Sequence, residues 1–432
     1  MERHGEPNLD QEATGSMPQE DKGKPFSWRG ILRYCAYRVG RSLLLLFGGL
    51  AVAAAFILLI EIGFRICLRA PAGLFAEFAV GKNGLYPEKR KIKMLWGPFP
   101  YSVETNSLGF RGREIKRTKS NRTFRIAAIG DSITDGVFVD NDATWEYSLQ
   151  DILTSRSHQA VEVLNCARAG GSIDKEFCIL KNLVLPLHPD LVILTFVTND
   201  IANILGKSRQ ELISMDIPTM RYGSDIELKQ YGADVTFWIV TKTAIGEVFY
   251  DTWLTLRSPS YRYGKQRLRS GDERYQVAGG DKFQENVKVF KKRFRRTDGI
   301  ILNESFSEQV QSTIDNYSYA LDKFAELCRQ NDIQLLFVYF PAYSQVYDPT
   351  SSVRINGILE KRCSELRIHF LDLTPAFRSK QGVVLHLAPI DFHPNPAGNR
   401  FFANAVADYL IAKRNSGTGY EFPQSHRQPK SP

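Results

Sequence analysis

Three residues of this sequence stand in contexts that suit nucleophilic catalysis. Ser132 follows an apolar β-type run, residues 124–129, within the string Gly-Asp-Ser-Ile-Thr. A serine hydroxyl attacks only when a base removes its proton, and the base works best when an acid fixes its tautomer. Of the seven histidines, His393 alone lies among turn-forming residues next to an acid, which is Asp391. The sequence therefore predicts Ser132 as the nucleophile, His393 as the base and Asp391 as the orienting acid.

Two loops offer donors for the oxyanion that develops in an acyl-transfer transition state. Residues 165–172 follow the second strand-like run, and Gly170 could present its backbone N–H there, with Gly171 as the alternative. Asn199 follows the third strand-like run and carries a side-chain amide. Together with the N–H of Ser132, these are three donors at the carboxyl ends of successive strands, where open α/β sheets bind ligands.

The elements that must position these residues alternate between strands and helices. Apolar β-type runs predict strands at 124–129, 161–164, 191–196, 334–340 and 369–373. Apolar residues at helical spacing predict helices at 144–154, 175–185, 306–328 and 397–413. This alternation is typical of a parallel sheet covered by helices. Residues 205–303 are too many for an ordinary crossover between strands, and we expect them to be an insertion.

Four ordered segments resemble the SGNH, or GDSL-type, hydrolase superfamily. They are Gly-Asp-Ser-Ile-Thr-Asp-Gly at 130–136, Asn-Cys-Ala-Arg-Ala-Gly-Gly-Ser at 165–172, Thr-Asn-Asp at 198–200 and Asp-Phe-His-Pro-Asn-Pro-Ala-Gly-Asn-Arg at 391–400. The similarity covers about residues 106–412, apart from the insertion. It implies an α/β fold, a three-layer α/β/α sandwich of flavodoxin-like type. It also implies Ser132 as nucleophile, His393 as base, and Ser132, Gly170 and Asn199 as oxyanion donors.

The sequence departs from the family's pattern at two places. The usual final motif has its acid three residues before the histidine, but Ile390 occupies that position. Asp391, two residues before the histidine, is similar to the shorter form found in membrane-associated polysaccharide O-acetyltransferases of the superfamily, and a Ser/His dyad is the alternative. Residues 197–198 are Val-Thr where many members have glycine. Asp131 and Asp135 lie beside the nucleophile, and we expect them to hold the turn.

The N-terminal part contains a candidate membrane span. Residues 42–60 are 19 residues without a charge, and the apolar character persists to Leu68. About 20 helical residues cross a hydrocarbon core of roughly 30 Å. A signal peptide or a buried core helix is the alternative, although the run is long and late for a signal peptide. Six Lys or Arg lie between residues 22 and 41 and three between residues 61 and 82, which predicts a cytoplasmic N-terminus and an extracytoplasmic globular part, periplasmic or at the cell surface.

Charge and cysteine usage limit the partners and cofactors. Residues 257–296 contain 13 Lys or Arg against 4 Asp or Glu, a net charge of +9 that equals the formal charge of the whole chain. A solvated surface explains this charge, and contact with a polyanion or anionic lipid is the functional alternative. Nucleic acid is excluded by the expected location. The six cysteines form no CxxC pair, so we expect no metal site, and the family resemblance implies no cofactor.

The expected organisation follows from these boundaries. It consists of a polar and basic N-terminus at 1–41, a transmembrane helix at 42–68, a juxtamembrane segment at 69–121, an SGNH-like domain at 122–412 and a disordered tail at 413–432. The resemblance and the anchor predict a membrane-anchored serine esterase that acts on O-acylated glycans or lipids of the cell envelope. An O-acetyltransferase that modifies an envelope polysaccharide, using the same residues, and a non-catalytic scaffold of a polysaccharide export complex are the alternatives.

Overall fold

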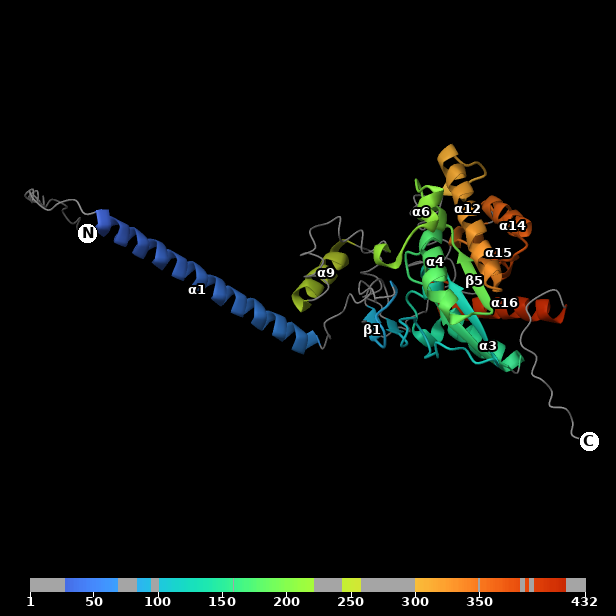
Figure 1. Cartoon of the computed structure of the whole chain (residues 1–432), viewed down its shortest axis with the longest axis horizontal. Coiled ribbons are helices and arrows are strands. Elements are labelled where there is room, and N and C mark those ends of the chain that lie inside the picture. Colours follow the sequence, from blue (N-terminus) through green and yellow to red (C-terminus); the bar gives the residue numbers. More distant parts are fainter. Residues whose placement is uncertain are drawn as a thin grey trace, which may run out of the picture. The chain divides into compact units, whose positions relative to one another are not determined.

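The computed structural model describes residues 28–68, 84–94, 101–157, 159–220, 243–257, 300–348, 350–380, 385–387 and 392–416. Two compact units divide the chain, Met1–Ile62 and Gly63–Pro432. Most of helix α1, Trp28–Leu68, belongs to the first unit, and all other described elements belong to the second (Figure 1).

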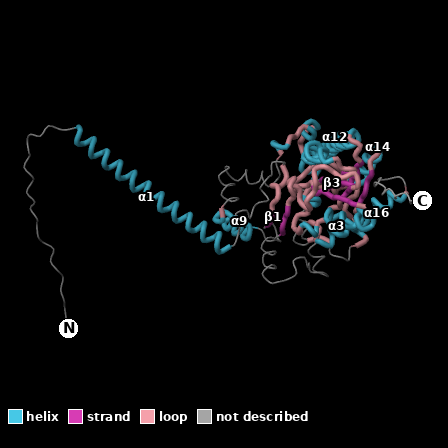
Figure 2. Tube along the Cα trace, turned by 60° about the horizontal axis from the view of Figure 1, so that its bottom comes forward, coloured by secondary structure: helices cyan, strands magenta, loops and turns pink. Residues whose placement is uncertain are grey.

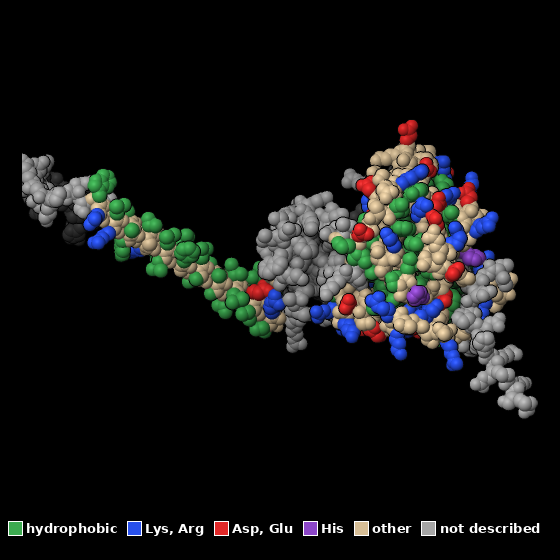
Figure 3. Space-filling view, in the orientation of Figure 1, with side chains coloured by type: hydrophobic (Ala, Val, Ile, Leu, Met, Phe, Trp, Pro, Cys, Tyr) green, Lys and Arg blue, Asp and Glu red, His purple; other side chains and the backbone are tan. Residues whose placement is uncertain are grey.

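Helix α1 carries exposed apolar side chains over most of its length. Its stretch Leu32–Ile66 is long and apolar enough to cross a membrane, and none of the tested window is buried. Leu44 and Ile66 are 74% and 71% exposed. Figure 3 shows hydrophobic side chains along most of this helix. A transmembrane helix and a signal sequence share these properties, and the helix begins at Trp28, well before the uncharged run that starts at Ser42.

The second unit is built on a parallel five-stranded sheet. Its strand order is β4-β3-β5-β6-β7, with the bounds Ala160–Asn165, Thr123–Ile129, Leu191–Phe196, Gln334–Tyr339 and His369–Asp372. Along the chain this is the order 2-1-3-4-5, which is the flavodoxin-like arrangement. All neighbouring pairs are parallel. All five predicted strands are present, and each begins and ends within one residue of its predicted limits.

Helices cover both faces of this sheet. Alternate residues of each buried strand therefore pack in different cores, one on each face. Ala127 and Ile129 of β3 pack in the core that contains residues of α4, α12 and α14, whose bounds are Ile173–Ile179, Glu308–Gln330 and Arg354–Leu366. Phe124 and Ile126 pack on the opposite face, with α3 and α16, whose bounds are Trp145–Ser157 and Pro396–Asn415. Figure 2 shows α12 and α14 on one side of the strands and α3 and α16 on the other. The three-layer α/β/α prediction is therefore confirmed.

Short elements complete the described fold. Two antiparallel strands, β1 and β2, pair upstream of the main sheet at Lys91–Met94 and Tyr101–Glu104. A π-helical turn at Leu180–Val184 and a 3-10 turn at Leu185–Leu187 continue α4, so the predicted helix at 175–185 changes its hydrogen bonding halfway. The remaining elements are α2 Ser132–Asp135, a 3-10 turn Asn141–Ala143, α5 Asn199–Asn203, α6 Arg209–Ile213, a 3-10 turn Ile217–Thr219, α9 Ala244–Arg257, α13 Tyr343–Tyr347 and α15 Thr374–Arg378.

Residues upstream of β3 are part of the packed unit. Leu85, Tyr86 and Phe110 are almost fully buried and belong to its hydrophobic cores. The Arg111 guanidinium donates to the backbone oxygens of Asp135 and Gly136 at 2.6 and 2.8 Å. These contacts join residues 85–111 to the unit that contains the main sheet. Of the basic segment 257–296, only Arg257 lies within the described residues.

Candidate active site

Ser132 lies at a sharp turn between β3 and α2. Gly130 precedes it, and a Cβ at that position would lie 2.4 Å from Oγ1 of Thr134 and 3.2 Å from the Thr195 carbonyl, so no larger residue fits. The fully buried Asp131 caps α2, because its Oδ1 accepts the Ile133 N–H at 3.0 Å. As the first residue of the helix, half-buried Ser132 keeps an N–H without an intrahelical acceptor.

His393 lies in a loop that is held by backbone hydrogen bonds between residues 385–387 and 393–395. The Leu387 N–H donates to the His393 carbonyl at 2.9 Å, and the Asn395 N–H donates to the Leu385 carbonyl at 3.0 Å. Asn395 then caps α16 through the Gly398 N–H at 2.9 Å. A Cβ on Gly398 would lie only 2.0 Å from the Leu385 carbonyl oxygen, so glycine is required for this close approach.

The histidine and the serine meet although 261 residues separate them. Nε2 of His393 lies 2.8 Å from Oγ of Ser132, a normal hydrogen-bond distance. The imidazole is only 6% exposed and packs edge-on against Phe138, with ring centroids 5.4 Å apart, and parallel to Phe392 at 4.6 Å. Phe138 has a left-handed backbone, φ 70°, which is costly for an aromatic residue and persists because the surrounding structure enforces it.

Two acids adjoin the predicted nucleophile and base in the sequence, Asp131 and Asp391. Asp391, the predicted orienting acid, lies outside the described residues, as does Ile390. Asp131, which the sequence assigned to the turn, also lies near the nucleophile, with Oδ2 3.4 Å from Oγ of Ser132. That distance is longer than the 2.8 Å from Oγ of Ser132 to Nε2 of His393, so the hydroxyl is better placed to donate to the imidazole than to Asp131.

Gly170 occupies a turn that leaves its N–H available. The Gly171 N–H donates to the Arg168 carbonyl at 3.0 Å, and Gly170 has φ 77°, a combination typical of a type II turn, which requires glycine at its third residue. The Ala169 N–H donates to Oδ2 of Asp135 at 2.9 Å. Within the described residues, the Gly170 N–H donates to no acceptor. Because the Gly171 N–H is used to close the turn, Gly170 suits the oxyanion role better than Gly171.

Asn199 begins α5 after β5, and its side-chain amide has a fixed orientation. Its Nδ2 donates to Oδ2 of Asp131 at 2.9 Å, across 68 residues of sequence. This contact identifies which end of the amide is the nitrogen, and it leaves the second N–H for another acceptor. Sequence reasoning missed this partner, because nothing in the residue types shows that two loops meet through these two side chains.

A second set of hydrogen bonds, also missed from the sequence, supports the glycine turn at residues 168–171. The Tyr86 hydroxyl donates to both carboxylate oxygens of Asp135, at 2.9 and 2.8 Å. Burial raises the pKa of Tyr86 above its usual value, and the Asp135 charge raises it further, so the phenol stays a donor. The Arg168 guanidinium covers the Tyr86 ring at 4.0 Å from its centroid.

Behind the turn lies a buried group of ionisable side chains. Glu176 and Asp200 are fully buried. Burial raises the pKa of Glu176 well above its usual value, and the neighbouring Asp131 adds to the effect. Burial also raises the pKa of Asp200, with Glu176 as the next cause. Lys175 is the cation that lies closest in sequence to these acids, and burial lowers its pKa. Carboxyls in such surroundings are stabilised in the neutral form.

Among the described residues, no group of three or more His, Cys, Asp or Glu side chains could hold a metal ion. Four cysteines of the second unit are buried free thiols: Cys166, Cys178, Cys328 and Cys363.

A family model and several solved structures are similar to this chain. A family model described as GDSL-like lipase/acylhydrolase matches residues 126–406, a range that includes Ser132, Gly170, Asn199 and His393. No curated protein matches the sequence. Among solved structures, an acetylxylan esterase from Geobacillus stearothermophilus is 14% identical, with a TM-score of 0.34, and covers 70% of this chain and 97% of its own.

Two further structures give similar values. The acetyl xylan esterase AlAXEase is 15% identical, with a TM-score of 0.35, and covers 67% of this chain and 100% of its own. An α/β hydrolase from the metagenome of Lake Arreo, Spain, is 13% identical, with a TM-score of 0.36, and covers 68% and 95%. The family match extends over more than half of the chain, and it agrees with the parallel sheet and its flanking helices. The chain therefore belongs to the GDSL-like lipase/acylhydrolase family, whose members are ester-acting hydrolases.

Proposed function

We propose that this protein is a membrane-anchored serine ester hydrolase that acts on O-acyl esters through Ser132, His393 and Asp391. The observation that supports this most directly is the 2.8 Å contact between Oγ of Ser132 and Nε2 of His393. A turn with an unused N–H at Gly170 and an oriented amide at Asn199 adds the donors that such chemistry needs.

The reaction begins when Oγ of Ser132 attacks the ester carbonyl carbon. The hydroxyl proton passes to Nε2 of His393 while the carbonyl electron pair moves onto the oxygen. The N–H groups of Ser132 and Gly170 and the Asn199 amide stabilise this oxyanion. Its collapse breaks the bond to the alcohol, which takes the proton from the imidazolium and leaves an acyl-serine. Water, activated by the same histidine, then releases the acid and restores the serine.

Asp391 would hold the neutral tautomer of His393 with Nε2 unprotonated and balance the charge of the imidazolium. A carboxylate only two residues away can act in this way if the loop folds back on itself. A Ser/His dyad is the alternative, and the replacement of Asp391 discussed below separates the two.

The location and substrate class are also proposals. The exposed apolar surface of α1 supports an anchor, and the excess of basic residues before it supports an extracytoplasmic hydrolase unit. Acylated glycans or lipids at the envelope would then be within reach. The basic segment 257–296 supports an additional contact with anionic headgroups or an acidic glycan.

The central test is covalent labelling of the full-length protein in detergent by a fluorophosphonate. In this reaction Oγ of Ser132 forms a bond to phosphorus, fluoride leaves, and the hydroxyl proton passes to the base. We expect the parent protein to be labelled on Ser132 and Ser132→Ala not at all. The same variant should lose hydrolysis of a short-chain aryl ester by several orders of magnitude.

Ser148→Ala is a suitable control, because Ser148 is a half-buried serine of α3 outside the proposed site. It should label and turn over like the parent. Labelling of the parent on a different residue, or activity of Ser132→Ala above about a tenth of the parent, would contradict the proposal. Incubation with an O-acetylated glycan, followed by analysis of the acyl product, separates hydrolysis from transfer.

A further inference from the structure

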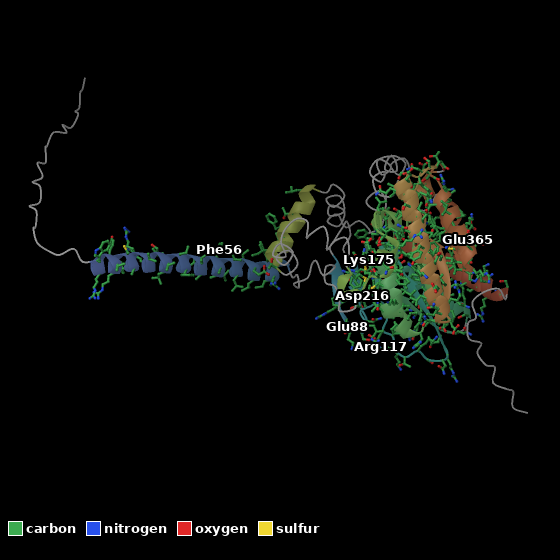
Figure 4. The ribbon with its side chains drawn as sticks, turned by 45° about the horizontal axis from the view of Figure 1, so that its top comes forward. Phe56, Glu88, Arg117, Lys175, Asp216 and Glu365 are labelled. Atoms are coloured by element: carbon green, nitrogen blue, oxygen red, sulfur yellow. The ribbon has the colours of Figure 1, made fainter. Side chains whose placement is uncertain are left out.

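Lys175 contacts the glycine turn directly, although it has no place in the motif that the sequence showed. The side chain extends from the first turn of α4, is only 7% exposed, and its Nζ donates to the Gly170 carbonyl at 2.7 Å. Figure 4 labels Lys175 within the second unit. A buried ammonium needs hydrogen-bond acceptors, and the Gly170 carbonyl supplies one of them.

The turn has three peptide planes, and the middle one carries the proposed oxyanion donor. The plane before it is fixed by the Ala169 N–H on Asp135, and the plane after it carries the Gly170 carbonyl and the Gly171 N–H. Glycine allows both planes that adjoin it to rotate at little cost. Of the two groups on the last plane, the N–H is held by the Arg168 carbonyl and the carbonyl by Lys175.

Burial lowers the pKa of Lys175, and the charged groups around it act in both directions. The acidic side chains that act on the ammonium favourably are Asp174 and Glu176 of α4 and Asp200 of α5, whereas the Lys207 ammonium opposes it. Lys207 forms an ion pair with Asp174 and does not touch the turn. Among the residues that the structure describes, Nζ of Lys175 donates to Gly170 of the proposed site, whereas Nζ of Lys207 pairs with Asp174.

We propose that Lys175 is a positioning residue for ester hydrolysis: its hydrogen bond to the Gly170 carbonyl fixes the turn and keeps the Gly170 N–H directed at the oxyanion. This inference rests on the proposed function. It gives Lys175 no contact with substrate, so the loss of its hydrogen bond should lower kcat and leave KM within about threefold. The decrease in kcat should be about 10- to 100-fold, smaller than the roughly 10²- to 10³-fold cost of removing a donor outright.

The test compares two variants of equal charge and nearly equal size. Lys175→Met removes the charge and the donor, whereas Lys175→Gln removes the charge but keeps an N–H donor, which lies one bond closer to the backbone than Nζ. We expect Lys175→Gln to be at least about tenfold faster than Lys175→Met in kcat and in the rate constant of fluorophosphonate labelling, because the phosphoryl oxygen occupies the same oxyanion site. Lys207→Met, which removes the neighbouring cation, should behave like the parent in both assays.

The rates of the three lysine variants either support the positioning role of Lys175 or contradict it. Equal rates for Lys175→Met and Lys175→Gln, or an equal loss in Lys207→Met, would show that the charge or the local packing matters and would overturn the inference. The labelling rate constant is independent of the amount of folded protein, so it gives an answer even if one variant is unstable. Failure of the parent to label on Ser132 would instead overturn the proposed function.

Discussion

Replacement of Asp131 by asparagine tests how the oxyanion site is assembled. Asp131 is fully buried and accepts two normal hydrogen bonds, from the Ile133 N–H at 3.0 Å and from Nδ2 of Asn199 at 2.9 Å. An asparagine can keep the first bond, because it caps helices as well as aspartate does. Its amide nitrogen would then face the nitrogen of Asn199, so that two donors meet at the second contact.

This conflict sets the expected size of the effect. The Asn199 amide can relieve it by rotating through half a turn, which places an acceptor where the proposed oxyanion donor was. The cost should therefore be at least that of losing the donor, about 10²- to 10³-fold in kcat. Since the replacement also removes a buried charge and retains the helix cap, the melting temperature should change by only a few degrees.

A double-mutant cycle measured with a short-chain aryl ester gives the decisive comparison. Asn199→Ala alone should lower kcat by about 10²- to 10³-fold. If Asp131 acts through Asn199, adding Asp131→Asn to that variant should cost less than about tenfold more. Independent, multiplicative losses would refute this reasoning and would indicate that the Asp131 carboxylate acts directly on Ser132 or on the imidazolium.

Three other predictions concern the acid, the topology and the buried carboxyls. Asp391→Asn should lower kcat by about 10³- to 10⁴-fold and His393→Ala at least as much, whereas near-parental kcat of Asp391→Asn from pH 6 to 9 would indicate a Ser/His dyad. A reporter fused after Pro432 should be active only outside the cytoplasm, and release of the protein in soluble form with residues 42–60 intact would exclude the anchor. Because the pKa of Glu176 is raised on folding, its contribution to stability is complete below its unfolded pKa and is lost as pH rises through the folded value. Glu176→Gln should therefore raise the melting temperature by a few degrees at pH 8 and little at pH 5. An equal change at both pH values would contradict this assignment.

The sequence was sufficient for the sheet because its strands are continuous apolar runs bounded by polar turns. The five strands lie within one residue of their predicted ends, and the strand order followed from the family resemblance. Ser132 and His393 could be predicted for a similar reason, since each adjoins a recognisable turn at an element end. The continuation of α4 as a π-helical turn was not predicted, because apolar spacing does not distinguish the two kinds of helical hydrogen bond.

The contacts that support the site could not be predicted, because they join residues of common types over unrelated distances. Asp131 and Asn199 are 68 residues apart, and Tyr86 and Asp135 are 49 apart. Lys175 is only five residues from Gly170, but a lysine in the first turn of a helix ordinarily extends into solvent. Packing of the sheet and the loops decides its direction, and that is a tertiary property.

The hydrogen bonds of Tyr86 have a mechanical consequence. Tyr86 lies upstream of the main sheet, on the side of the chain that leads back to α1, and only Asp135 separates it from the Ala169 N–H of the glycine turn. The end of the fold that lies nearest to α1 along the chain is therefore itself a support of the turn. A force applied to the chain at Tyr86 would therefore reach the turn through the Asp135 carboxylate.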